Sequence, residues 1–192
     1  MRIPPPVALS LAFLLAACGG SNSASSDSGN SSPGFFSRMF GGSSGPTLTC
    51  PEITKVGDAV KLTRFSPGGH DLTDVLFEAA VGAVGGSCSS GDNGSVNVAL
   101  NVQFTASRGP ADKTRKALFT YFVAIVDKSE NILAREQFDT GVAFPGNQTR
   151  NTAVEELEEN IPLQKGQQGN QFRVFIGFVL TPDEVAYNRA HP

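Results

Sequence analysis

One stretch of strict alternation restricts what this 192-residue chain can fold into more than any other feature. Within residues 95–107 the apolar side chains fall at every second position: Val96, Val98, Leu100, Val102 and Phe104. A period of two is the repeat of a β-strand, whose successive side chains point to opposite faces of the sheet. The sequence therefore predicts a strand with one apolar face, and the other face carries Asn97, Asn101 and Gln103.

Two further strand patterns precede this one. Residues 53–56 and 59–65 are apolar enough to predict a hairpin that turns at Gly-Asp, positions 57–58. Residues 74–84 alternate again, and the Gly-Gly pair at 85–86 is expected to end that strand.

The second half of the chain contains the strongest apolar runs. Residues 118–126 are nearly all apolar and predict a central strand that is buried on both faces. A turn at 127–131 leads into residues 132–140, which completes a hairpin, and residues 172–180 form the last strong strand.

Two segments carry helix signals. Thr181, Pro182 and Glu184 have the spacing of a capping box with proline at the first helical position, so a short C-terminal helix is expected. Residues 152–163 are ambiguous: Thr152 could cap a helix, but the β-rich surroundings favour a strand equally, and both alternatives stay open.

Together these patterns predict an all-β domain over residues 47–192. About seven strands with turn residues between them indicate an immunoglobulin-like or fibronectin-like antiparallel sandwich with a short C-terminal helix. The chain has no tryptophan, so the buried Trp of antibody domains is absent and the likeness concerns general architecture.

Cys50 and Cys88 are expected to form a disulfide, because an isolated pair most simply does so in the oxidising compartment that an N-terminal secretory signal at residues 1–17 implies. The bond closes a loop of about 38 residues, which restricts the unfolded chain by roughly 3 to 4 kcal/mol. Two free thiols, or a metal site with His70 and His191, are the alternatives. The close ligand spacing of a zinc site is missing, so no metal is predicted.

The first 17 residues have the pattern of a secretory signal. Arg2 supplies a positive charge, and residues 7–17 are nearly all apolar. That run is too short to cross a bilayer as a helix and is typical of a signal peptide.

A lipobox ends the signal. Positions 15–18 are Leu-Ala-Ala-Cys, the pattern in which the thiol of the cysteine accepts diacylglycerol before cleavage. Cys18 is therefore predicted to become the lipid-bearing first residue of the mature protein, anchored without spanning the membrane. In lipoproteins of this kind an Asp after the cysteine signals inner-membrane retention. Here Gly19 follows, which favours the outer membrane.

Residues 18–46 are predicted to be a tether that carries one aromatic island. The segment is rich in Ser, Gly and Asn, and a chain of about 28 such residues has a reach of roughly 30 Å. The island consists of Phe35, Phe36, Arg38, Met39 and Phe40. It is either a docking motif for a partner, a patch that enters the membrane surface, or a segment that packs on its own domain.

Composition and motifs argue against several functions. A net charge of −3 lacks the basic footprint of a nucleic-acid binder. Ser66, His70 and Asp71 share one Pro-Gly-Gly turn, where neighbouring side chains diverge and cannot form a catalytic triad. The acids at 155–159 are expected to be a solvated face. No catalytic residue and no cofactor are predicted.

Several short motifs suggest a family. They are the lipobox, the Gly/Ser tether, the second cysteine Cys88, and the short motifs Cys50-Pro51, Arg108-Gly109-Pro110, Gly177-Phe178 and Tyr187-Asn188-Arg189. Through these features the chain resembles small envelope lipoproteins of α-proteobacteria. Cys50 with residues 57–62 is also similar to a segment in accessory lipoproteins of the outer-membrane β-barrel assembly machinery. There the segment is extended and docks on a partner lipoprotein, whereas a disulfide at Cys50 would hold it in the fold.

These features lead to an expected function. We expect a non-enzymatic, lipid-anchored protein of the outer membrane that faces the periplasm and serves as an interaction or assembly module. A more specific version of this expectation is an accessory of outer-membrane β-barrel assembly. Its expected partners are the membrane, through the N-terminal lipid, and an envelope protein. The alternatives are a lipoprotein that binds a glycan, peptidoglycan or small ligand, and an enzyme built on dispersed carboxylates.

Overall fold

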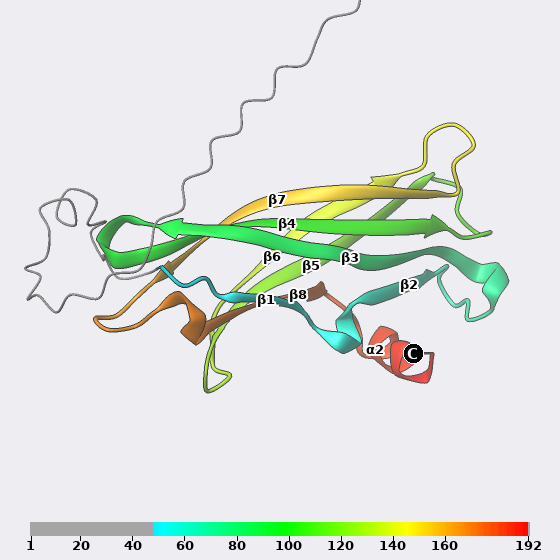
Figure 1. Ribbon diagram of the computed structural model, residues 1–192. Coiled ribbons are helices and arrows are strands. Elements are labelled where there is room, and N and C mark those ends of the chain that lie inside the picture. Colours follow the sequence, from blue (N-terminus) through cyan, green and yellow to red (C-terminus); the bar gives the residue numbers. More distant parts are fainter. Residues whose placement is uncertain (1–47, 192) are drawn as a thin grey trace, which may run out of the picture. The chain divides into compact units, whose positions relative to one another are not determined.

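The computed structural model describes residues 48–191, which form two stacked β-sheets (Figure 1). The elements in chain order are β1 (Glu52–Lys55), β2 (Lys61–Phe65), β3 (Val75–Ser90), β4 (Ser95–Arg108), β5 (Lys116–Asp127), β6 (Ile132–Ala143), β7 (Arg150–Pro162), β8 (Phe172–Phe178) and α2 (Pro182–Ala190). The predicted signal at 1–17, the lipidation site Cys18, the tether at 18–46 and its aromatic island lie outside the described residues.

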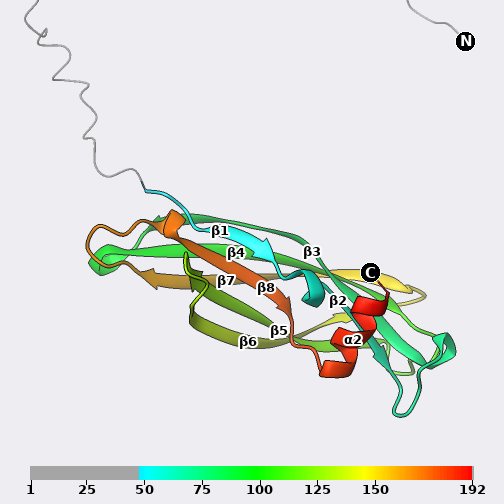
Figure 2. The same cartoon turned by 90° about the horizontal axis from the view of Figure 1, so that it is seen from below.

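The two sheets have different strand orders. Sheet A is β1-β8-β5-β6, seen face on in Figure 2, and sheet B is β2-β3-β4-β7. All pairs are antiparallel except β1 with β8, which is parallel. The predicted all-β sandwich with a short C-terminal helix is confirmed. Its strand order is not the A-B-E-D and C-F-G order of immunoglobulin domains, so the likeness is architectural.

The core forms where β4 meets sheet A. The five alternating side chains of β4 are all buried, which confirms the predicted alternation: Val96, Val98, Leu100, Val102 and Phe104. The ring of Phe104 lies with its centroid 5.2 Å from that of Phe119, 4.8 Å from that of Tyr121 and 5.7 Å from that of Phe178. Each such aromatic pair adds roughly 0.5–1.5 kcal/mol beyond area burial, so this cluster helps to hold the sheets together.

The predicted hairpin over residues 53–65 is wrong. β1 belongs to sheet A and pairs with β8, whereas β2 belongs to sheet B and pairs with β3. A single 3-10 turn at Gly57–Ala59 carries the chain from one sheet to the other. Both strands then contribute to the core from opposite layers, Ile53 from one and Leu62 from the other.

The predicted strand break at Gly85 and Gly86 is also wrong, because β3 continues to Ser90. A Cβ atom on Gly86 would lie 2.1 Å from the carbonyl oxygen of Ala99 on β4. Glycine at this position therefore allows the two strands to approach closely, which is a known use of glycine inside a strand.

The apolar run in β5 is buried on both faces over only half its length. Val123, Ala124, Ile125 and Val126 are all buried, but Leu118 is 65% exposed on the outer face of sheet A. The turn after β5 and the hairpin with β6 form as predicted.

The ambiguous residues 152–163 form a strand, and they make up most of β7. The predicted capping box begins α2: the amide of Glu184 donates to Thr181 Oγ1, and Glu184 Oε2 accepts from the amide of Thr181.

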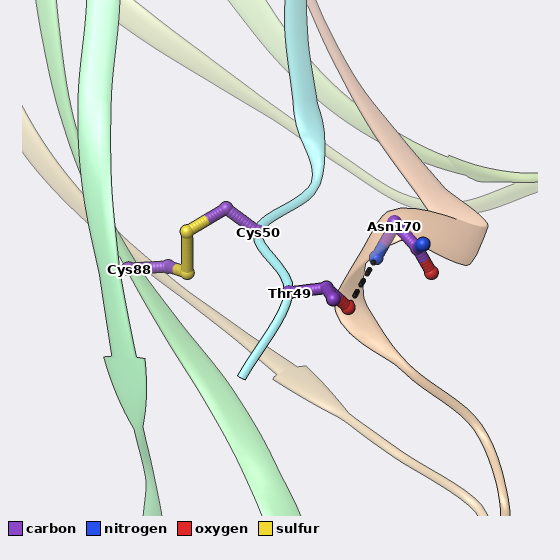
Figure 3. The surroundings of a disulfide bond; sticks show 4 residues. All are labelled: Thr49, Cys50, Cys88 and Asn170. Atoms are coloured by element: carbon purple, nitrogen blue, oxygen red, sulfur yellow. Dashed lines mark hydrogen bonds between the residues drawn. A yellow bond between two sulfur atoms is a disulfide. The ribbon is translucent and has the colours of Figure 1, made fainter. Parts of the chain in front are cut away.

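The predicted disulfide between Cys50 and Cys88 is confirmed, with a Cα–Cα distance of 5.7 Å (Figure 3). Cys50 lies two residues before the start of β1 in sheet A, and Cys88 lies near the end of β3 in sheet B. Beside it, the amide of Asn170 donates to Thr49 Oγ1 at 3.3 Å. The bond therefore joins the two sheets at one side of the sandwich.

Candidate functional site

The β1–β2 side of the sandwich is closed by short strands and by covering elements. The edge strands β1 and β2 have four and five residues. In both views α2 lies beside β2 (Figures 1 and 2), and Asn188 Nδ2 donates to the carbonyl oxygens of Lys61 at 2.7 Å and Asp58 at 3.0 Å. Short edge strands and a covering helix are recognised ways to prevent unwanted pairing at a sheet edge, and the disulfide ties the chain before β1 to β3.

The β6–β7 side is built differently. The edge strands β6 and β7 have 12 and 13 residues, and within residues 48–191 each pairs along one side only. Near one end they approach each other: Asn151 Nδ2 donates to the carbonyl oxygen of Ala143 at 2.8 Å, and Thr140 Oγ1 donates to Glu155 Oε1 at 2.5 Å. Beyond this contact, the outer backbone hydrogen-bonding groups of β6 and β7 have no β-partner within residues 48–191.

The acidic run of β7 is divided between the two faces of the strand. Glu155, Leu157 and Glu159 lie opposite Val102, Leu100 and Val98 of β4, whose side chains fill the core. Glu155 is consequently half-buried, and Glu159 is only 9% exposed. The expectation that the whole run is solvated is therefore wrong for these two glutamates.

The other two acids of the run, Glu156 and Glu158, are exposed on the outer face of sheet B, as expected of a solvated face. The signal that could have separated the two pairs is the strand period of two. It was not decisive, because residues 152–163 also matched a helix.

Tyr121 on β5 connects this acidic strand to sheet A. Its side chain is 0% exposed, and its hydroxyl finds no hydrogen-bond partner within residues 48–191. Burial, followed by the charges of Glu155 and Glu159, raises its pKa to about 12. Sequence analysis missed this residue, because it lies in an apolar run that suggested only core packing.

Glu136 adds a third carboxylate from β6, where it lies opposite the inward-facing Val123. Burial and the nearby charge of Glu136 both raise the pKa of Glu159. We call Glu136, Glu155, Glu159 and Tyr121 the acidic edge. Within residues 48–191 no group of three or more His, Cys, Asp or Glu side chains is placed to hold a metal ion. Carboxylates accept hydrogen bonds and attract positive charge, so the acidic edge suits an N–H donor with a positive charge.

Glu159→Gln is expected to raise the melting temperature at pH 8 by roughly 3 °C, equivalent to about 1 kcal/mol in a domain of this size. The folded pKa of Glu159 is raised, so stability falls as the pH rises from the unfolded pKa of about 4.3 through the folded pKa. The gain should therefore disappear at pH 4. Differential scanning calorimetry at both pH values tests this, with the exposed Glu158→Gln as control. Equal increases in melting temperature at pH 4 and pH 8 would show that the charge of buried Glu159 does not destabilise the fold.

The Ser66–Asp71 loop is held by structural contacts. The carboxylate of Asp74 accepts hydrogen bonds from the backbone amides of His70 at 3.2 Å and Asp71 at 3.3 Å. Asp71 is also the N-cap of the following 3-10 turn. In the described part of the chain, no hydrogen bond joins the side chains of Ser66, His70 and Asp71. The cluster is therefore a loop between β2 and β3 with no triad geometry.

A groove of about 340 Å³ with mixed polar and apolar walls lies between α2 and sheet B. Its walls include Thr63, Glu78, Ser107, Arg150 and Asn188, and Tyr187 provides an aromatic ring. These side chains offer both donors and acceptors, so the groove can bind a polar ligand.

Comparison of the chain with protein-family models, with curated proteins and with solved structures gave no match. Within residues 48–191, no helix combines the length and the apolar character needed to cross a membrane.

Proposed function

We propose that this protein is a non-enzymatic lipoprotein of the outer membrane that faces the periplasm and docks an envelope protein along the β6–β7 side of its sandwich. The observation that carries the proposal is the contrast between the two sides. One is closed by short strands, α2 and the disulfide, whereas the other presents strands of 12 and 13 residues with free edges. Free edges of this length are the usual surface for adding a strand from a partner.

The sequence before the sandwich supports the anchored part of the proposal. The lipobox at 15–18 marks Cys18 as the lipid acceptor, and the Gly/Ser-rich residues 18–46 supply a spacer. Tethering raises the effective concentration of the domain near partners in the same membrane. The aromatic island at 35–40 serves in this proposal as a second contact for the partner.

The partner class is an assembly component of the envelope, and the β-barrel assembly machinery is one candidate. The segment that resembles its accessory lipoproteins does not support docking in extended form. Cys50 is bonded to Cys88, and residues 57–62 belong to the turn after β1 and to β2. We therefore assign docking to the β6–β7 side.

Crosslinking in intact envelopes tests the proposal. A photo-crosslinking residue at Val154, which is 57% exposed on β7, should capture a discrete envelope protein. The same residue at Glu52, exposed on the opposite edge strand β1, should not. Mass spectrometry of the purified chain should find Cys18 lipidated at the N-terminus. Equal crosslinking from both positions, no crosslink at Val154, or an unmodified Cys18 would count against the proposal.

The groove beside α2 favours a second candidate, a lipoprotein that binds a glycan or peptidoglycan. Its wall combines hydrogen-bonding side chains with the ring of Tyr187, a composition suited to a polar ligand. Incubation with purified peptidoglycan separates the candidates. If the protein is retained by peptidoglycan and Arg150→Ala abolishes this retention, ligand binding in the groove is supported. If the protein is not retained, this candidate is wrong.

A further inference from the structure

We propose that the free edge of β7 recognises an extended segment with basic side chains at two positions four residues apart and an apolar side chain midway between them. This inference rests on the proposed docking function and specifies the chemistry of the partner. The recognition elements are Glu155 and Glu159, with Leu157 between them and Tyr121 near both acids. Glu155 Oε1 already accepts from Thr140 Oγ1, so Glu155 contributes its Oε2.

The spacing follows from strand geometry. The three inward side chains of β7 occupy alternate positions, so Glu155 and Glu159 are about 13 Å apart along an extended strand. A strand that pairs with the free edge places its own side chains directly opposite, with Cβ atoms roughly 4.5–5.5 Å away. A basic residue opposite each glutamate and an apolar residue opposite Leu157 match this edge in either strand direction.

The buried hydroxyl of Tyr121 is the second observation that points to a ligand. A buried tyrosine hydroxyl normally has a hydrogen-bond partner, and its absence is costly. Here the hydroxyl has none within residues 48–191 although the side chain is fully buried, and both glutamate charges act on it. An ammonium or guanidinium group between the acids supplies N–H donors to the phenol oxygen and to the carboxylates together.

The charge of the acidic edge explains why the occupant is a basic segment and not a second copy of this chain. Glu136, Glu155 and Glu159 contribute three carboxylates around the same inner surface, and burial, followed by the charge of Glu136, raises the pKa of Glu159. Two β7 edges brought together would set like charges opposite each other, which destabilises pairing. Inward-pointing charges of this kind prevent self-association and at the same time select a partner of opposite charge.

Peptide binding to the purified full-length chain tests the inference. A labelled nine-residue peptide carries Lys at positions 3 and 7, Val at position 5 and Thr elsewhere. A second peptide of the same composition has its lysines at positions 4 and 6, on the opposite face. Fluorescence anisotropy should show about tenfold tighter binding of the first peptide, the expected result of two opposite-charge pairs across strands. Equal affinities would overturn the inference.

Two double variants of β7 test whether the glutamates on its inner face account for peptide binding. Glu155→Gln with Glu159→Gln should weaken binding of the first peptide about tenfold, whereas Glu156→Gln with Glu158→Gln should change it less than twofold. Both pairs remove the same charge from the same strand, so equal losses would show general attraction and overturn the inference. Unchanged melting curves or an increase in stability establish that the inner pair still folds.

The two proposals can fail separately. If Val154 still crosslinks its envelope partner in the Glu155→Gln, Glu159→Gln background with undiminished yield, docking stands and basic recognition is wrong. If the first peptide binds as expected but no envelope partner is captured at Val154, recognition of the basic segment stands and the proposed envelope function is wrong.

Discussion

Replacing Asp112 with alanine is expected to lower the free energy of unfolding by about 2–3 kcal/mol, because it removes a buried carboxylate that accepts several hydrogen bonds and pairs with a partly buried arginine. The Asp112 side chain is 4% exposed, and its carboxylate accepts from Arg108 Nε at 2.7 Å. It also accepts from the amide of Thr114 at 2.7 Å, from its hydroxyl at 2.8 Å and from the amide of Arg115. Alanine leaves all of these donors without their acceptor in the turn that joins β4 to β5.

The control for this prediction is Asp127→Ala in the turn between β5 and β6. Asp127 also accepts three N–H donors, from Ser129 and Asn131, but it lies in an exposed turn where water can replace it. Urea denaturation should show a clearly smaller loss for Asp127→Ala. Equal losses would mean that burial of Asp112 does not set its contribution.

The pH dependence of the Asp112 contribution has a definite sign. Burial alone would raise the pKa of this carboxyl, but the hydrogen bonds from Arg108, Thr114 and Arg115 outweigh burial and lower it. The folded pKa therefore lies below the unfolded value of about 3.9. The stabilisation is present above the unfolded pKa and is lost as the pH falls through the folded pKa. Asp112→Ala and the wild type should converge in stability as the solution becomes strongly acidic.

The architecture was predictable wherever a local pattern carries the information. The alternation from Val96 to Phe104 needs only one buried face, so β4 could be derived from its own residues. The helix at the C-terminus depends on Thr181 and Glu184, three residues apart, and the turn before β6 depends on Asp127 and Asn131. In each of these cases the residues that determine the structure lie close together in the sequence.

The assignment of strands to sheets could not be derived in this way. Whether β1 pairs with β2 or with β8 depends on contacts between Ile53 and Val174, more than a hundred positions apart. Gly86 suggested a break by its identity alone, and only the approach of Ala99 on β4 shows why it lies inside a strand. Pairing over such distances is decided by packing in three dimensions and leaves no local signal.

The acidic edge was missed for the same reason. Glu155 and Glu159 look like part of a solvated run until the strand period places them on the inner face. Tyr121 looks like a core residue until its hydroxyl is found without a partner among residues 48–191. The site consists of residues that break the usual rules of burial, and such exceptions concentrate at functional positions.

Replacing both Cys50 and Cys88 with serine is expected to lower the free energy of unfolding by about 4 kcal/mol, the chain-entropy value for a loop of this length. The closed loop spans a sequence separation of 38 residues. The loss should be greatest locally, because β1 has four residues and pairs only with β8 at the edge of sheet A. Without the bond, native-state hydrogen exchange at Val56, whose amide donates to the carbonyl oxygen of Ile176 on β8 at 3.0 Å, should accelerate more than in β4.

Release of β1 would also expose the edge of β8, so the side of the sandwich that is now closed would become open to pairing. The double variant should therefore aggregate more readily than the wild type, whereas binding of the basic peptide at β7 should remain. Wild-type protein treated with a reductant is the matched control, since it has the same free loop without a substitution. Unchanged exchange at Val56 in both samples would show that the pairing of β1 with β8 suffices, and that the disulfide is not what keeps this edge closed.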